Sequence, residues 1–443
     1  MQIEERTPRS SLIPGLERNV ANYETLEDLT AVLKNVYLPI RKKAFPLLTP
    51  LVANARRAGP DKVRYAGNDL FFDVKLGRRG GFVSSARGFL PEHNTAEERQ
   101  GRLGITRLYA RPEVDGLSDA ATRQSKGAFI SQNMKVVEDV MDQWQIEQER
   151  CLHGDSTGIR AVVDTVTDTT HIIVDNPYGI TDAGPGNLHL VVGDTIAVLS
   201  STGATQRGKA KITVIALSAD AATLTLDTAI AGMVAGDVVV TAVPTAISST
   251  DNSFGAEPHG LKSIVDIEAN FATFEGINHA RWLAQTLSST TIDETLVMRL
   301  LNTIRARAGI DWRANPKAMG LFTSTGIWQL YGDSLLGLRR FDAPTMELNG
   351  GFRGVQVAGA TLIDDPWGPR KRLYAVHFPD TIFIDLMDFG ELKFKDSPTW
   401  VRAANRDAWE VVFATYWNYG VTMRSSHGCI YNITDSVNYS PVF

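Results

Sequence analysis

The segment Ala161–Thr250 differs in composition from the rest of the chain and limits the folds open to it. It contains no Glu and one aromatic residue, Tyr178, but it is rich in Val, Ile, Thr, Asp and Gly. Short runs of β-branched residues separated by Gly and Asp are typical of strands joined by tight turns. We therefore predict a small all-β domain at 161–250, inserted into a larger α+β body.

The strands expected in this domain are bounded by turn residues. They are Leu188–Leu199, Lys211–Ser218, Ala222–Ile230 and Asp237–Val243. Two similar stretches, Val192–Ile196 and Ala235–Val239, each place a Gly-Asp pair directly before a strand. Because Gly-Asp is ordinary turn chemistry, the similarity gives only weak support for an internal repeat.

The stretch Gly203–Ala210 comes close to a phosphate-binding loop in sequence. The match fails at Ala210, where such a loop needs a Ser or Thr hydroxyl to hold magnesium. A helix should also follow, so that its N-terminal amides face the phosphate. Lys211–Ile215 alternates as a strand does. The stretch is therefore interpreted as a β-hairpin turn.

Charge is unevenly distributed along the chain. The formal net charge is −5, and the segment 161–250 accounts for it with eight acids, all Asp, against three bases. The remainder is neutral, so no global basic surface for nucleic acid is expected. The N-terminal residues are polar, and no stretch approaches the roughly 18 apolar residues of a membrane span. We expect a protein of the aqueous cytoplasm without membrane contact.

Residues 1–60 are predicted to form an extended arm followed by a helical stretch that prolines interrupt. Residues 61–115 are predicted to form a long β-hairpin, with strands at Asn68–Leu76 and Arg102–Arg111 and a glycine-rich loop between them. A two-stranded hairpin with a long loop is marginal on its own in water. We therefore expect this hairpin to rest on a neighbouring subunit, with a mobile surface insertion as the alternative.

Charged residues of both signs gather in this hairpin. They are Arg78, Arg79, Arg87, Glu92, Glu97, Glu98, Arg99 and Arg102. The three glutamates would repel phosphate, which argues against a nucleic-acid groove. The hypothesis we favour is ion pairing with charged groups of an adjacent subunit, and a solvated loop is the alternative.

Two helices carry clear signals. Ser118–His153 has a candidate N-cap at Ser118 and Gly154 directly after its end. Its apolar stripe is expected to contain Ile130, Met134, Val137, Met141, Trp144 and Cys151. Thr291–Ala308 begins with the capping-box pair Thr291 and Glu294 and stops at Gly309.

The buried face expected for this second helix consists of Ile292, Leu296, Val297, Leu300, Leu301 and Ile304. Beyond it, alternating short strands and helices are expected to about Phe394, and aromatic strands close the chain from Trp400 to Ile433.

No catalytic, cofactor or metal motif stands out. The two cysteines, Cys151 and Cys429, are far apart, and the eight histidines are scattered without metal-ligand spacing. The pair Asp364 and Asp365 precedes Pro366 and is interpreted as a strand end that enters a turn. We expect a protein that is not an enzyme and that needs no cofactor or metal.

The order of these parts resembles the tailed-bacteriophage major capsid protein family, with its Hong Kong phage-type capsid fold. Local phrases are similar as well. They are Gly260-Leu261, Phe274–Ile277, Asp365–Gly368, Phe378–Asp380 and Tyr419–Arg424. The resemblance covers nearly the whole chain and depends on architecture, because the family has no catalytic signature.

The resemblance implies a division of the chain into the domains of that fold. They are an N-terminal arm at 1–60, an extended loop at 61–115, a peripheral domain with a spine helix at 116–160, an inserted all-β domain at 161–250, the second part of the peripheral domain at 251–310, an axial domain at 311–394, and peripheral return strands with the C-terminus at 395–443.

It also implies a structural role. Copies of the chain would form hexamers and pentamers of an icosahedral head that encloses double-stranded DNA without sequence-specific contact. The implied partners are a separate scaffolding protein, a portal and a decoration protein. The implied location is the virion, after assembly in the host bacterial cytoplasm. Two alternatives stay open: an encapsulin-like cellular shell, and a carbohydrate-binding or hydrolytic protein whose β module is 161–250.

Overall fold

The computed structural model describes most of the chain between residues 49 and 434. The described residues are 49–55, 64–66, 69–77, 80, 84, 88, 90, 92, 97–117, 132–181, 183–217, 221–265, 282–336, 345–347, 353–357, 359–392, 400–404 and 406–434. Most of the expected arm, the first part of the helix expected from Ser118, and the stretch Phe274–Ile277 therefore lie outside the described residues.

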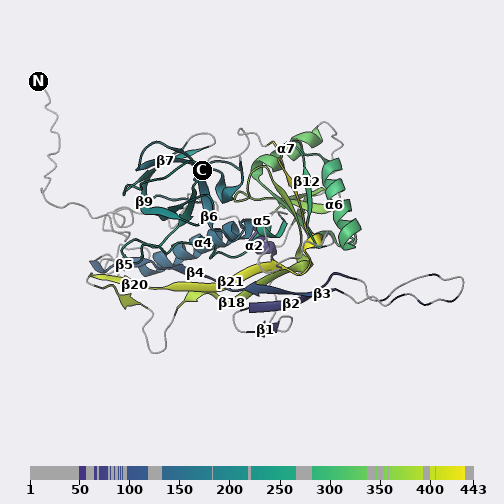
Figure 1. The fold of residues 1–443 in the computed structure, drawn as a ribbon, viewed down its shortest axis with the longest axis horizontal. Coiled ribbons are helices and arrows are strands. Elements are labelled where there is room, and N and C mark those ends of the chain that lie inside the picture. Colours follow the sequence, from purple (N-terminus) through teal and green to yellow (C-terminus); the bar gives the residue numbers. More distant parts are fainter. Residues whose placement is uncertain are drawn as a thin grey trace, which may run out of the picture.

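Long antiparallel strands form one layer of the molecule (Figure 1). The order in this sheet is β18 (Thr381–Glu391), β21 (Phe413–Val421) and β4 (Thr106–Ala110). A smaller sheet has the order β19 (Val401–Arg402), β20 (Ala408–Glu410) and β5 (Glu113–Asp115). Helix α4 (Gln132–His153) runs along the long strands, and its Trp144 stacks on Phe389 of β18 at 4.8 Å between ring centroids.

The predicted hairpin is present, with corrected bounds. Its sheet has the order β1 (Arg64–Ala66), β2 (Asp69–Lys75) and β3 (Glu98–Gly104). The expected alternation is confirmed, because Leu70, Val74 and Leu76 are buried while Asp73 and Lys75 are exposed. The single strand expected at Arg102–Arg111 is wrong. The chain leaves β2 after Gly104 and pairs with β21 from Thr106 onward, so two strands in two sheets share that stretch.

Helix α4 ends at His153 as predicted, but its buried face differs from the expected stripe. Val137, Met141 and Trp144 are half-buried, whereas Val136 and Ile146 are buried. The last six residues, Gln148–His153, are buried on all sides although four of them are polar or charged. The cause is tertiary, since sheets and loops enclose the end of this helix. Ser118 and Ile130 lie outside the described residues.

The segment predicted to be all-β closes into a six-stranded antiparallel barrel. The barrel order is β10 (Ala222–Leu226), β7 (His171–Asp175), β6 (Ile159–Val166), β11 (Val238–Thr241), β8 (Thr195–Leu199) and β9 (Gln206–Leu217). Strands β6 and β7 were not expected. The strand expected from Leu188 begins only at Thr195, because the residues before it form turns.

The two similar Gly-Asp stretches are the same turn used twice. Asp194 accepts a hydrogen bond from the Val191 amide, and Asp237 accepts one from the Val234 amide, both at 2.9 Å. Gly193 and Gly236 have φ of 106° and 88°, which side chains disfavour. These turns directly precede β8 and β11, which pair antiparallel. The same turn conformation therefore sets the start of two neighbouring strands.

The stretch resembling a phosphate-binding loop is the β8–β9 hairpin, and a strand follows it as predicted. Lys209 lies on β9 and donates through Nζ to the backbone carbonyl groups of Val243 and Ser248 at 3.1 and 3.0 Å, and also to that of Asp251. Its ammonium group therefore anchors the loop that follows β11.

A seven-stranded sheet forms the third unit. Its order is β12 (Gln285–Ser288), β22 (Gly428–Tyr431), β17 (Leu373–His377), β13 (Met319–Thr323), β16 (Ala360–Asp364), β15 (Arg353–Val357) and β14 (Thr345–Glu347). Helices α6 (Glu294–Ala308) and α7 (Thr325–Leu336) pack with it. This sheet thus includes residues from the expected ranges 251–310 and 395–443 as well as from 311–394.

Helix α6 has the predicted buried face and the predicted end. Val297, Leu300, Leu301 and Ile304 are fully buried, and Gly309 ends the helix with φ of 71°. The expected cap is wrong. Asp293 is the N-cap and accepts from the Leu296 amide at 2.7 Å, so the helix starts two residues later than the Thr291 and Glu294 pattern indicates.

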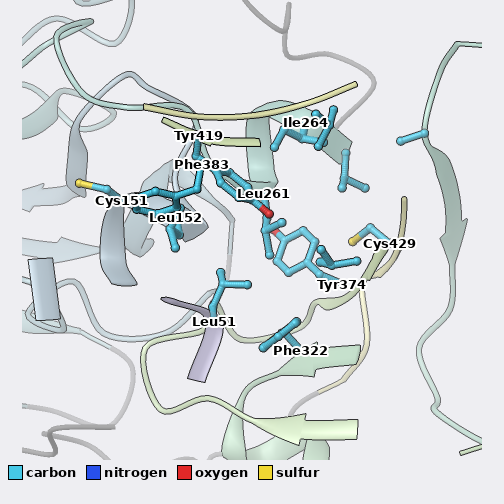
Figure 2. Close-up of a cluster of buried hydrophobic side chains, with 14 of the residues drawn as sticks. Leu51, Cys151, Leu152, Leu261, Ile264, Phe322, Tyr374, Phe383, Tyr419 and Cys429 are labelled. Carbon is cyan, nitrogen blue, oxygen red and sulfur yellow. The ribbon is translucent and has the colours of Figure 1, made fainter. Parts of the chain in front are cut away.

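A common core joins the layers at the end of α4. Leu51 of the short helix α2 (Pro50–Asn54) packs with Cys151 and Leu152 of α4, beside side chains from the long sheet and from the seven-stranded sheet (Figure 2). The short helix α5 (Leu261–Val265) adds Leu261 and Ile264 to this cluster. Among the described residues, no helix is long and apolar enough to cross a membrane.

The cap of α6 gives a direct stability test. Asp293→Ala should lower the free energy of unfolding by about 1 kcal/mol, because the Leu296 amide loses its partner. Thr291→Ala is the matched control and should change it by less than about half of that. Urea denaturation of both variants checks the assignment, and a larger loss for Thr291→Ala would restore the capping box as the true start.

Candidate functional site

The charged hairpin residues divide into two groups. Arg78, Arg79 and Arg87 lie outside the described residues, so their predicted contacts are not placed. Glu92, Glu97, Glu98, Arg99 and Arg102 are described, and all five are exposed. The structure thus leaves this surface open to solvent in the single chain.

Two of these arginines have partners within the chain. Arg99 Nε lies 3.3 Å from Glu97 Oε1, and Arg102 forms an ion pair with Asp69. The Arg99 and Glu97 side chains are 59% and 50% exposed, so their attraction is weak in water. Glu98 faces Lys75 across the two strands. None of these pairs is strong enough to hold the hairpin in place.

The base of the hairpin is fixed by apolar packing instead. Leu70 and Leu103 pack against Ile382 and Ile384 of β18. Beyond them, Val74 and Leu76 cover Trp282. The described part of the hairpin therefore projects from an anchored base, with charged residues at its outer end.

A second candidate site is a buried ionic junction, which we define as Glu147, Arg150, Arg160 and Glu257. Arg150 is 1% exposed; its Nε lies 3.0 Å from Glu147 Oε1, and its Nη2 lies 2.8 Å from that oxygen and 2.7 Å from Glu257 Oε1. Arg160 of β6 also forms an ion pair with Glu147. The junction thus ties α4 to both ends of the segment that forms the barrel.

The charges of the junction are strongly coupled. Burial alone would raise the pKa of Glu147, but the positive charges of Arg150 and Arg160 outweigh burial and hold that pKa well below its usual value. Burial also raises the pKa of the neighbouring Cys151 thiol, which therefore stays protonated. Glu147 is an ionised partner, and Cys151 is a packed thiol without nucleophilic character.

A second polar group lies on the next face of α4. His153 Nε2 is 2.6 Å from Asp365 Oδ2, and Asp365 Oδ1 accepts from the Trp367 amide at 3.0 Å. Glu149 Oε1 and Oε2 accept from the Leu51 and Val52 amides at 2.7 and 2.8 Å. We call Glu149, His153 and Asp365 the carboxyl–histidine group.

Both clusters bring together side chains of the types that bind metal ions. In the described part of the chain, Glu147, Cys151 and Glu257 form one group with ligand-type atoms within 4.8 Å of one another, and the carboxyl–histidine group forms another. The first already holds two guanidinium groups, which supply its positive charge. In the second, the carboxylate oxygens already accept backbone amides and the His153 ring. The residues fit ion pairing and proton sharing better than metal ligation.

A cleft of about 690 Å³ opens beside the junction. Its walls come from β4, from the middle of α4 and from the barrel turn before β8, with Tyr109, Trp144 and Val191 among the lining residues. Arg150, Arg160 and His189 also line it. This cleft therefore lies where the barrel meets the long sheet.

Part of this arrangement had a signal in the sequence. Glu149 and His153 are four residues apart, and Glu147 and Arg150 are three apart, so each pair shares a helix face. These spacings could have indicated a cluster of polar contacts at the C-terminal end of α4. Asp365 and Glu257 are more than 100 residues away, and no local pattern connects them to α4.

Comparison with solved structures identifies the fold. The chain in the cyanophage A-1(L) capsid matches with a TM-score of 0.50 at 13% sequence identity, over 92% of this chain and 98% of that chain. The capsid of the native GTA particle matches with a TM-score of 0.45 at 9% identity, over 92% and 97%. The holo-SrpI encapsulin complex from Synechococcus elongatus PCC 7942 matches with a TM-score of 0.42 at 7% identity, over 95% and 98%.

The chain has the fold of a phage capsid protein. At 13% identity, the likeness to the cyanophage capsid chain concerns the fold alone. The resemblance expected from the order of the sequence parts is confirmed at that level, as is the expected mixture of helix and sheet. No family model matches the sequence, and no curated protein matches it either.

The ionic junction predicts a large cost for removing its central cation. Arg150→Met should lower the free energy of unfolding by about 3 kcal/mol or more, because Glu147 and Glu257 would keep their charges without that partner. Chemical denaturation measures the loss.

Arg305→Met is the control for this test. Its ion pair with Asp311 spans 3.8 Å between side chains that are 46% and 50% exposed, so its loss should cost less than about 1 kcal/mol. Equal effects of the two substitutions would show that the junction does not stabilise the fold more than a surface pair.

Proposed function

We propose that this protein is the major capsid protein of a tailed bacteriophage, a shell-forming subunit. Its copies assemble into hexamers and pentamers of an icosahedral head around double-stranded DNA. The observation that carries the proposal is the shared fold with the cyanophage capsid chain, which spans 92% of this chain and 98% of the other. This likeness of fold extends over nearly the full length of both chains.

The parts of the fold receive roles in this proposal. The stretch 1–60 is the N-terminal arm, and β2, β3 and the loop between them are the extended loop of 61–115. Helix α4 is the spine of the peripheral domain, with the long strands as its sheet. The axial domain that surrounds the capsomer centre is 311–394, which supplies β13 to β17 of the seven-stranded sheet. The barrel is the inserted domain.

The hairpin is where the physical argument for a neighbour is strongest. Its base is packed on β18, but the outer end of β3 is exposed from Glu97 to Gln100. A long exposed hairpin gains stability when another surface covers it. The adjacent subunit of the shell is the surface that we propose.

The charged hairpin residues belong to the same proposal. Glu92, Glu97, Glu98 and Arg99 are exposed and available to charges of an adjacent copy. Arg78, Arg79, Arg87 and Arg102 complete the proposed contact set. Pairs that are weak at the surface of one chain become stronger when a second chain excludes water from them.

The remaining partners follow from this role. A separate scaffolding protein and a portal would act in assembly, and a decoration protein would bind the outer face. DNA would be enclosed without sequence-specific contact, since the net charge of −5 offers no global basic surface. The virion is the proposed location, after assembly in the host cytoplasm.

The carbohydrate alternative loses its main support in the barrel. Sugar sites use exposed aromatic rings as platforms, and Tyr178 is the only aromatic residue between 161 and 250. It is 1% exposed, and its hydroxyl donates to the Trp367 carbonyl at 2.7 Å. It therefore packs the barrel against the seven-stranded sheet. The encapsulin alternative predicts a protein cargo in place of DNA, so the contents of purified particles decide between the two shells.

Shortening the hairpin tests the proposal. The ends of the loop already meet, because the Leu76 and Gly77 amides both donate to the Glu97 carbonyl, at 2.8 and 3.2 Å. Replacing residues 78–96 by a short Gly-Asn-Gly turn should leave the melting temperature nearly unchanged. It should abolish closed shells, as observed by sedimentation velocity and negative-stain electron microscopy.

The control keeps the loop length and removes its side chains. A Gly-Ser linker in place of 78–96 should also fail to close shells if side-chain contacts with the neighbour are required. Normal particles from the short-turn variant would contradict the role of the hairpin, and a wild-type protein that never forms shells or capsomers would contradict the proposed function itself.

A further inference from the structure

Helix α2 is capped by a residue from another part of the chain. The Thr49 side chain makes no capping hydrogen bond, and Pro50 has no amide proton. The Leu51 and Val52 amides, which would otherwise lack partners, both donate to the Glu149 carboxyl group. Glu149 of α4 thus does for α2 what an N-cap residue normally does.

This capping carboxyl group lies against a second one. Carboxyl oxygens of Glu149 and of Asp365, which follows β16, lie within 4.8 Å of each other, and both residues are completely buried. A hydrogen bond between two carboxyl groups requires a proton on one of them. Two ionised carboxylates in this position would repel each other with little water to screen them.

Other charged or titratable groups lie near this pair of carboxyl groups. His153, one turn further along α4, contacts Asp365, and Arg150 is engaged by Glu147 and Glu257. From the barrel side, Tyr178 faces the pair, and burial raises the pKa of its hydroxyl, which therefore stays neutral. Helix α2 itself has the sequence PLVAN and brings only backbone amides.

We propose that α2 is held by a proton-linked latch, in which Glu149 caps α2 firmly while Glu149 and Asp365 share one proton, and loss of that proton to solvent releases α2 from α4. The proton lies in the hydrogen bond between the two carboxyl groups and leaves two carboxylates behind. In the released state Glu149 is solvated and ionised, and the Leu51 and Val52 amides bind water.

The direction of the pH effect follows from the pKa of Glu149. Burial and the charge of Asp365 raise this pKa well above its usual 4.5 in the docked state. A group whose pKa is raised by docking stabilises the docked state. This stabilisation is fully present at a pH below the group's ordinary pKa, and it is lost as the pH rises through the pKa of the docked state. Docking of α2 is therefore firm in mild acid and weakens toward alkaline pH.

The latch controls more than one short helix. Leu51 is fully buried and covers Cys151 and Leu152 in the core that joins the layers. Proton release at Glu149 therefore loosens the packing of Leu51 in this core as well as the capping of α2.

Hydrogen–deuterium exchange of the full-length chain tests this proposal. The amides in the peptide 49–55 are followed between about pH 6 and about pH 9, with rates corrected for intrinsic exchange. Their protection should fall with rising pH by up to about tenfold per pH unit, because one proton is linked to docking.

Two substitutions separate the latch from general pH effects. Glu149→Gln stays neutral at every pH and can still donate to Asp365, so protection of 49–55 should lose its pH dependence. Glu138→Gln removes a charge from the exposed face of the same helix and should keep the wild-type slope. Asp365→Asn provides a second neutral variant if Glu149→Gln does not fold, and it should also remove the slope.

Three outcomes would overturn the latch. One is wild-type protection that does not change with pH, and another is a neutral variant at Glu149 or Asp365 that keeps the slope. The third is protection at alkaline pH that zinc restores and a chelator removes, since a cation would then occupy the place assigned to the proton.

Discussion

The described fold depends on charged groups that are buried at the end of α4. Arg150 lies between the carboxylates of Glu147 and Glu257. The adjacent Glu149 holds α2, and His153, about one turn further on, contacts Asp365. The barrel, the seven-stranded sheet and α2 all reach the last two turns of this helix. Burying unpaired charges there would cost several kcal/mol each, so the units can come together only in the arrangement that pairs them.

The ionic junction fixes the orientation of the barrel relative to α4 more than it stabilises the fold. An apolar junction of the same volume could be as stable, but it would tolerate sliding of the barrel over α4. Directional pairs do not allow that movement, because Arg150 and Arg160 must both reach Glu147. Apolar packing supplies the stability instead, in the core around Leu51, Leu152 and Tyr374 and in the separate core of the barrel (Figure 2).

Local patterns in the sequence predicted the elements whose structure depends on residues that are close together in the chain. Period-two alternation indicated the buried side of β2, helical spacing indicated the buried face of α6, and β-branched composition indicated the barrel segment.

The cap of α6 was misplaced because Thr291 and Asp293 are both residue types that cap helices. Only the backbone conformation shows that Asp293 is the N-cap. The buried charges of α4 were missed because charged residues on a helix usually face water. Their partners Glu257 and Asp365 are brought close by the fold alone, so a single sequence without contacts could not connect them. The charged hairpin residues were recognised as a group, but one sequence does not identify the residues of an adjacent copy that we propose as their partners.

In the shell that we propose, a neighbouring copy of this chain covers the outer end of the hairpin. The most direct measurement is a cryo-electron microscopy reconstruction of the assembled particle at side-chain detail. We expect closed shells in which the loop between β2 and β3 lies on an adjacent copy, with Glu97, Glu98 and Arg99 facing charges of that copy. A shell in which this loop contacts only its own chain or open solvent would contradict the proposed role of the hairpin.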